Sequence, residues 1–342
     1  MTQITHDNHF VPQLYLKQWS EDGKRIWAYR LLASNRRVPL WELRSIRGIG
    51  FQRDLYTEYV NGQEVDEFEK WMESEYEMPA QDALNKVIHD KPLTTVDWER
   101  LALFLAAQDV RTPTSYLESK TRWENTLPNL LENTLKASVN EIEAHMAKGE
   151  TIKNIDADSS QTFRKALKIQ ITPDSESRGS FISAEITVGR ALWLDSQRLL
   201  LTKTAKALLN HKWSIVEPAA GNEWFTSDHP VIKLNYYKDN THDLKGGWGN
   251  PKTDLIMPLS PRHLLFTEIG VDAPDRFSFS REKTIEIQSF LAEKASRWIY
   301  ARQRTRKIVQ LRPREVDLKA FREEEEQLKK WHQEQSDVEK RQ

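Results

Sequence analysis

The sequence predicts a mixed α+β protein, with a largely helical first half after a short extended N-terminal region and a strand-rich C-terminal block with flanking helices. Two observations predict this class. Between residues 65 and 150, apolar side chains recur at the 3.6-residue spacing of amphipathic helices. Between residues 212 and 270, short segments rich in β-branched and aromatic residues are bounded by proline and glycine, which is typical of strands.

The N-terminal third supplies most of the helical signal. FVPQLYLKQW and RIWAYRL are expected to be extended, and Asn61-Gly62 to close a hairpin. One helix is expected from Val65 to about Lys86. The next has Thr95 as its cap, breaks at Thr112-Pro113 and continues as a polar helix to about residue 150.

The remaining elements follow in order. A long helix is expected from Ser183 to Leu209, followed by four strand segments, a helix at residues 282–297 and a last strand at WIYAR. The predicted organisation is residues 1–147 as an extended segment and helices, 148–161 as a connector, 162–312 as a block interleaved with the first part, and 313–342 as a charged helical tail.

The composition excludes several classes of protein. With 50 Lys and Arg against 51 Asp and Glu, the net charge of -1 gives no global attraction to nucleic acid, so any such binding needs a local patch. The lack of cysteine excludes disulfides, thiolate catalysis and cysteine-bound zinc. Without a signal-peptide pattern or an apolar run of about 20 residues, we expect a cytoplasmic protein with no membrane partner.

Familiar catalytic motifs are missing from the sequence. Neither GxGxxG nor GxxxxGK[ST] occurs, so a standard dinucleotide or P-loop site is not expected. HExxH and GxSxG are also missing, which removes the signatures of the zinc proteases and the α/β-hydrolases.

Polar residues occupy positions where the helical pattern calls for apolar ones. The face of Phe68, Trp71 and Met72 continues at Glu75, and the face of the next helix continues at Gln108 and Arg111. A buried arginine needs an acidic or phosphate partner, so Glu75 and Arg111 are expected to pair across packed helices. The set is either a structural ion pair or a pocket in which Gln108 and Arg111 bind a ligand.

Two further segments carry candidate site residues. In EWFTSDHPVIKL, Ser227 and Asp228 come at the end of a predicted strand, as turn formers or as site residues. His9 is a histidine in an extended segment. Together with Glu75 and Asp228 it would form a His/carboxylate set suited to a divalent metal, with Glu75 and Asp228 as ligands.

The order of motifs resembles the domain of unknown function 4238 family of bacterial proteins. The segments that match are NHFVPQLYLKQWS, DLYTEYV, the acidic helix with Glu69 and Glu75, FLAAQDVRTP, EWFTSDHPV and MPLSP. The resemblance covers roughly residues 8–300 and favours one shared pocket for His9, Glu75, Gln108, Arg111 and Asp228. The spacing of Glu67, Glu69, Glu73 and Glu75 fits the acidic helix in more than one alignment.

Two functions are compatible with these residues. The first is a metal-assisted hydrolase of nucleic acid or nucleotides, with a role in phage defence as its setting. In it, Glu75 and Asp228 hold the cation or activate water, His9 transfers protons, and Arg111 stabilises phosphate charge, with Ser227 and Gln108 contacting the ligand. The alternative is a non-catalytic module that binds a ligand or partner and whose buried polar cluster is structural.

Overall fold

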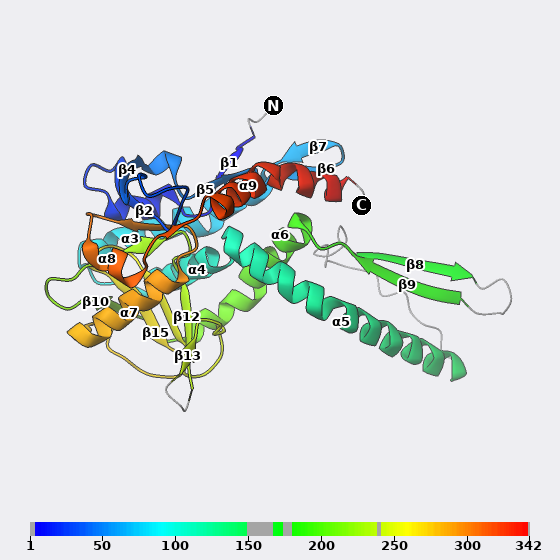
Figure 1. The fold of residues 1–342 in the computed structure, drawn as a ribbon. Coiled ribbons are helices and arrows are strands. Elements are labelled where there is room, and N and C mark those ends of the chain that lie inside the picture. The colour runs from blue at the N-terminus through cyan, green and yellow to red at the C-terminus, as the bar shows by residue number, and fades with distance from the viewer. Residues whose placement is uncertain (1–3, 149–166, 174–179, 238–240, 341–342) are drawn as a thin grey trace.

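The computed structural model describes residues 4–148, 167–173, 180–237 and 241–340, and it confirms the predicted α+β class (Figure 1). The helical elements are α1 (Gln13–Leu16), η1 (Lys17–Trp19), η2 (Ile46–Gly48), α2 (Glu67–Met72), η3 (Glu73–Glu77), α3 (Met78–Ile88), α4 (Thr95–Val110), α5 (Pro113–Ala147), α6 (Arg190–Leu199), η5 (Leu200–Thr204), η6 (Ala205–Asn210), α7 (Arg281–Lys294), α8 (Arg306–Leu311) and α9 (Leu318–Glu339).

The strands occur between these helices, partly in long runs such as β10 to β16. They are β1 (Asp7–His9), β2 (Arg25–Arg30), β3 (Leu32–Ala33), β4 (Trp41–Ser45), β5 (Phe51–Arg53), β6 (Glu58–Val60), β7 (Gln63–Val65), β8 (Leu167–Pro173), β9 (Ser180–Ile186), β10 (Ser214–Glu217), β11 (Thr226–Ser227), β12 (Ile232–Tyr236), β13 (His242–Asp243), β14 (Asp254–Pro258), β15 (Leu264–Glu268), β16 (Arg276–Ser278), β17 (Trp298–Ala301) and β18 (Glu315–Val316).

Two sheets organise the body of the molecule. A six-stranded sheet has the order β13-β12-β14-β15-β10-β16. A four-stranded sheet has the order β11-β17-β2-β4, so it joins strands from the two ends of the sequence. Its central pair is antiparallel, with Trp298 opposite Arg30 and Ala301 opposite Trp27.

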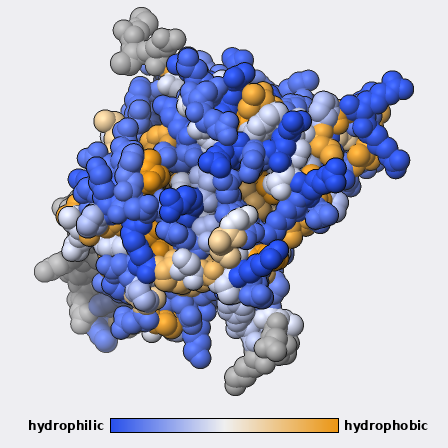
Figure 2. Space-filling view, turned by 90° about the vertical axis from the view of Figure 1, so that its left-hand side faces the viewer, coloured by the Kyte–Doolittle hydropathy of each residue, from blue (hydrophilic) through white to orange (hydrophobic). Residues whose placement is uncertain are grey.

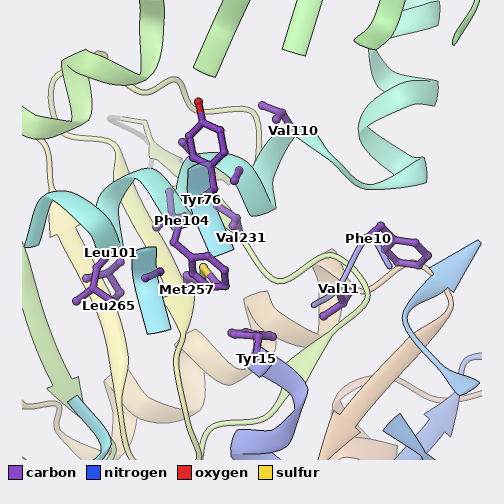
Figure 3. Packing of buried hydrophobic residues seen from close by; sticks show 14 of the residues in the cluster. Phe10, Val11, Tyr15, Tyr76, Leu101, Phe104, Val110, Val231, Met257 and Leu265 are labelled. Carbon is purple, nitrogen blue, oxygen red and sulfur yellow. The ribbon is translucent and has the colours of Figure 1, made fainter. Parts of the chain in front are cut away.

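The larger core lies between helix α4 and the six-stranded sheet. Figure 3 shows Leu101 and Phe104 of α4 in one cluster with Met257 of β14 and Leu265 of β15. All four side chains are fully buried. Each buried apolar side chain of this size contributes roughly 1.5–3 kcal/mol, so this contact is a main source of stability.

Most predicted elements are found close to their predicted positions. The hairpin at Asn61-Gly62 joins β6 to β7, and both residues have the positive φ angles, 49° and 82°, of the favoured two-residue turn. The break before Pro113 is also present, because α4 ends at Val110 and α5 starts at Pro113.

Three local predictions are wrong. FVPQLYLKQW is not extended, because residues 13–19 form a helical turn whose Tyr15, Leu16 and Trp19 enter the core. The helix expected from Ser183 begins only at Arg190, since residues 180–186 pair with β8 as a strand. The cap of α4 is Thr94 rather than Thr95.

Helix α5 and the β8–β9 hairpin extend away from the body of the protein (Figure 1). They lie together along a hydrophobic groove lined by residues of α5 such as Trp123 and Leu127 and by Ile186 of β9. The connector predicted at residues 148–161 lies, apart from Lys148, outside the described residues.

The charged tail packs back on the body instead of fraying. Helix α9 places Trp331 against Tyr116, with ring centroids 4.7 Å apart, and its residue Glu339 forms a buried ion pair with Arg190. The face shown in Figure 2 is mostly hydrophilic, with hydrophobic side chains in scattered patches. Among the described helices, none combines the length and the apolar character needed to span a membrane.

Candidate functional site

Arg111 is the centre of a buried polar cluster. It is the C-cap of α4, and its side chain is fully buried. Its Nη1 donates to Glu77, its Nη2 donates to the His9 carbonyl at 2.5 Å, and its Nε lies 3.5 Å from the Tyr56 hydroxyl. A second carboxylate, Glu69, lies 4.0 Å from Nη2. We call these residues and the adjacent Gln108 the arginine cluster; its members are His9, Tyr56, Glu69, Glu77, Gln108 and Arg111.

The acidic partners of Arg111 differ from the predicted one. Glu75 is exposed, so the predicted pairing of Glu75 with Arg111 is wrong. The reason is that residues 73–77 form a π-helical turn, which has more residues per turn than an α-helix. This turn moves the buried face from residue 75 to Tyr76 and brings Glu77 towards Arg111.

Burial shifts the pKa values of two members of the cluster in opposite directions. Desolvation raises the pKa of Glu69 to about 7, although the positive charge of Arg111 opposes this shift. Desolvation, assisted by Arg111, lowers the pKa of His9. At neutral pH, Glu69 is therefore about half protonated and His9 is a neutral imidazole.

Several polar atoms of the cluster have no hydrogen-bond partner among the described residues. They are Nε2 of His9, Oε2 of Glu69 and both polar atoms of the Gln108 amide. Gln108 is completely buried. An unsatisfied buried polar group costs about 1–3 kcal/mol, so each such group in a native protein calls for an explanation, such as catalysis or a bound molecule.

A neighbouring helix adds similar groups. Trp193 and Gln197 lie four residues apart on α6 and are almost completely buried, and their side-chain nitrogens, with the Gln197 oxygen, also lack partners. The Trp193 ring lies 5.9 Å from the ring of Tyr56, the residue that contacts Arg111. These two residues were not predicted from the sequence; their four-residue spacing, which places a glutamine on the same helix face as a tryptophan, is the signal that could have found them.

Asp228 and Ser227 are buried at the end of β11, and their side chains accept hydrogen bonds from backbone nitrogens. Asp228 accepts hydrogen bonds from the backbone nitrogens of Ser296 at 2.9 Å, Arg297 at 2.7 Å and Trp298 at 3.2 Å. The Ser227 hydroxyl accepts from the backbone nitrogen of His229. Asp228 thus fixes the connection between α7 and β17, and burial raises its pKa to about 6.

The structure does not support a metal site made of Glu75 and Asp228. Glu75 is exposed on η3, while the carboxylate of Asp228 is occupied by three backbone donors. The arginine cluster fits a cation no better, because Arg111 contacts both Glu69 and Glu77 and supplies the positive charge.

One other set of residues has metal-ligand chemistry. Asp90, Glu217 and His263 have ligand atoms within 4.8 Å of one another, and they form the one such group within the part of the chain that the structure describes. Arg276 lies 2.9 Å from Asp90, and Arg262 lies 3.4 Å from Glu217. These two cations already balance the carboxylates, which disfavours a metal ion.

A cavity of about 800 Å³ lies beside the arginine cluster. We call it the tail cavity, because helix α9 forms one of its walls. It is lined by Phe10, Arg30, Arg44, Gly48, Ile49, Gly50, Phe51, Gln52, Arg53, Asp54, Arg297, Trp298, Tyr300, Glu324, Glu325, Leu328, Lys329, His332 and Gln333.

The predicted site residues hold two walls of the tail cavity in place. Arg111 binds the carbonyl of His9, which precedes the lining residue Phe10. Asp228 accepts hydrogen bonds from the backbone of Arg297 and Trp298, and both of these residues line the tail cavity. His9 is paired with Phe51 across strands β1 and β5, and the two rings lie 5.6 Å apart.

Comparison with known proteins agrees with these motifs. The family model described as "Protein of unknown function (DUF4238)" matches residues 7–305 of the 342 residues. No curated protein and no solved structure matches the chain. The match spans the arginine cluster and the Asp228 turn, whereas helix α9 lies beyond it. The chain therefore belongs to the DUF4238 family of proteins of unknown function.

Proposed function

We propose that this protein is a hydrolase of phosphate esters in which His9 and Glu69 act as the base and the acid. The observation that supports this most is the placement of the His9 imidazole and the Glu69 carboxylate around one buried arginine. Nε2 of His9 has no hydrogen-bond partner among the described residues, and Oε2 of Glu69 lies 4.0 Å from Arg111 Nη2. Both side chains are half-buried, but these two atoms are themselves buried, so a substrate would reach them only after a local rearrangement of the cluster.

The shifted pKa values suit the two roles. A carboxyl group whose pKa is raised by burial can act as a general acid near neutral pH, as in other enzymes that separate two titrating groups by environment. A neutral imidazole can act as a base. The pKa of Glu69 is raised to about 7 and that of His9 is lowered below 6.5, so near neutral pH the imidazole is neutral while much of the Glu69 carboxyl keeps its proton.

In the proposed step, a water oxygen attacks phosphorus while His9 takes one of the water's protons. The bond between phosphorus and the leaving oxygen breaks, and the Glu69 carboxyl gives that oxygen its proton. The products are a phosphate and an alcohol, and the proton on His9 then returns to Glu69 through solvent. Arg111 acts as a positioning residue, because its Nε, Nη1 and Nη2 all face protein groups.

The experiment measures hydrolysis of p-nitrophenyl phosphate, bis-p-nitrophenyl phosphate, nucleotides and short RNA and DNA by the full chain. We expect Glu69→Gln to lower kcat by about 10²–10⁴-fold, the usual contribution of a general acid. Glu75→Gln is the matched control, because Glu75 is exposed on the same helical stretch and should leave kcat unchanged. Hydrolysis that survives in Glu69→Gln would disprove this assignment.

The pH profile provides a second test. Activity needs His9 neutral and Glu69 protonated, so kcat/KM should rise as pH increases through the lowered pKa of His9 and fall above about pH 7. Chelation with EDTA should leave the rate unchanged. Loss of activity in EDTA would instead place the reaction at a metal site.

The second candidate is a non-catalytic module with a structural arginine cluster. It is favoured by the donors of Arg111, which are directed at Glu77, at the His9 carbonyl and at Tyr56. If no substrate is hydrolysed and Glu69→Gln only changes the melting temperature, this second function is correct.

A further inference from the structure

The tail cavity has the chemistry of a nucleotide site. Its lining includes five cationic residues, which are Arg30, Arg44, Arg53, Arg297 and Lys329. It includes three carboxylates, which are Asp54, Glu324 and Glu325. The cavity is therefore net positive, although the whole chain has a formal charge of -1.

Aromatic side chains lie next to these cations. The guanidinium groups of Arg30 and Arg44 lie 5.4 Å and 5.1 Å from the centre of the Trp298 ring. Phe51 and Phe10 contribute further rings to the lining. Aromatic faces with neighbouring cations are the usual means of binding a base and its phosphate.

Two carboxylates of α9 form ion pairs with the arginines of the tail cavity. Glu324 of α9 lies 2.7 Å from Arg30 and 3.5 Å from Arg297, and Glu325 lies 3.4 Å from Arg30. A carboxylate and a phosphate bind arginine through the same geometry. The two glutamates therefore stand where an anionic ligand would bind.

One buried polar atom in the wall is not satisfied by the protein. Nε of Arg30 has no hydrogen-bond partner among the described residues. The same wall is held by Asp228 through the backbone of Arg297 and Trp298. The protein thus fixes a charged aromatic surface in which Arg30 keeps an unused donor.

We propose that the tail cavity binds a nucleotide, with its base on Trp298 or Phe51 and its phosphate on Arg30, Arg44 and Lys329. The shared chemistry is a base joined to a phosphate, which occurs both in a free nucleotide and at the end of a nucleic-acid strand. The cavity borders the arginine cluster through the His9–Phe51 pair, so the inference rests on the proposed hydrolase for its substrate class.

Binding is measured by isothermal titration calorimetry on the full chain, so it does not depend on hydrolysis. The probes are AMP, GMP, CMP and UMP, with adenosine and inorganic phosphate as half-ligands and a 5′-phosphorylated trinucleotide as the second source. We expect at least one mononucleotide to bind with a Kd below about 1 mM and more tightly than either half-ligand. A trinucleotide that binds more tightly than the mononucleotides would identify a strand end as the ligand.

Variants test the position of the ligand. Trp298→Leu should weaken binding at least about fivefold, because a stacked base contributes about 1–3 kcal/mol. Lys329→Gln should weaken binding of the nucleotide but not of adenosine. Arg36→Gln, an exposed arginine outside the cavity lining, is the control and should leave Kd unchanged.

Glu324→Gln should act in the opposite direction. It removes a carboxylate that competes for Arg30 and Arg297, so nucleotide should bind several-fold more tightly. A merely structural role of Glu324 would not improve binding. Circular dichroism spectra and melting curves show whether each variant is folded.

The outcomes separate this inference from the proposed function. If nucleotides bind equally to the wild type and to Glu69→Gln, with no hydrolysis in either, the cavity is a binding site and the proposed hydrolase is wrong. If phosphate esters are hydrolysed but no nucleotide binds, the cavity inference is wrong. Binding that neither Trp298→Leu nor Lys329→Gln weakens would also overturn it.

Discussion

A single carboxylate, that of Asp228, connects the end of one strand to the start of another. It accepts three backbone hydrogen bonds from residues 296–298 and is 4 % exposed. Since Arg297 and Trp298 line the tail cavity, this residue sets the shape of that wall. Its effect on function is therefore expected through position rather than through contact with a ligand.

Removal of this carboxylate should destabilise the fold. Asp228→Ala leaves three backbone donors without their acceptor, and we expect the free energy of unfolding to fall by about 3 kcal/mol. Urea denaturation at pH 7.5 measures this change. Asp275→Ala is the control, because Asp275 forms only an exposed ion pair with Lys212 and should cost less than about 1 kcal/mol.

The size of this effect should depend on pH. Burial raises the pKa of Asp228 from 3.8 to about 6, so the native state binds the proton more tightly than the unfolded chain. The contribution of the carboxyl is then present below pH 3.8 and is lost in part as pH rises through about 6. The difference in free energy of unfolding between the wild type and Asp228→Ala should be larger at pH 5 than at pH 7.5. A larger difference at pH 7.5 would contradict the assigned pKa shift.

Single residues also show where sequence reasoning succeeds and fails. Gln108 and Arg111 are buried as the helical pattern predicts, because α4 is α-helical up to Val110 and its C-cap Arg111 keeps right-handed helical backbone angles. Glu75 is exposed, because no pattern in the sequence indicates the π-helical turn at residues 73–77. Glu69 was one of the glutamates of the acidic helix, but only the three-dimensional contacts with Arg111 identify Glu69 and Glu77 as its partners.

At the level of elements, the start of α4 is determined by specific side-chain bonds. Thr94 caps α4 through a capping box, in which its hydroxyl accepts from the backbone of Asp97 and the Asp97 carboxylate accepts from the backbone of Thr94. The sequence has threonine at both 94 and 95, so the residue type alone does not show which of the two is the N-cap. The bonds of the Asp97 carboxylate identify Thr94.

The two threonines form a matched pair for an experiment. Thr94→Ala should lower the free energy of unfolding by about 1 kcal/mol, the usual loss on removing an N-cap. Thr95→Ala places a good helix former at the first helical position and should have almost no effect. Thermal unfolding monitored by circular dichroism compares them, and equal losses in the two variants would contradict the assigned cap.

Long helices were predicted better from the sequence than short elements whose structure depends on contacts with distant residues. Long periodic segments such as α4 and α5 are visible in the sequence, because their apolar faces repeat over many turns. Residues 180–186 become a strand because they pair with β8 over seven residues, a contact that local sequence cannot reveal. The helical turn at residues 13–19 likewise depends on the core that receives Tyr15 and Trp19.

On the scale of the whole molecule, the two ends of the chain meet. Strand β17 pairs with β2, and β18 pairs with β3, so the sheet contacts bring residues near 300 to residues near 30. Helix α9 then covers the tail cavity and contacts β6. A charge-rich sequence does not predict this packing, because charged residues usually indicate a solvated helix.

The far end of α9 is held by a buried ion pair. Arg190, at the start of α6, is completely buried and donates to Glu339 at 2.9 Å and 2.6 Å. Glu339 also accepts from the backbone nitrogen of Tyr59 at 2.8 Å. The last turn of α9 therefore joins three parts of the chain that are far apart in sequence.

From this arrangement we expect the C-terminal helix to stabilise the fold, although it lies beyond the residues that the family model matches. Glu339→Gln leaves a buried arginine without its charge partner, and we expect a loss of about 3–5 kcal/mol in the free energy of unfolding. Glu326→Gln removes an exposed ion pair with Lys330 on the same helix and should leave the free energy of unfolding almost unchanged. Urea denaturation distinguishes the two, and equal, small losses would show that α9 rests on the body without stabilising it.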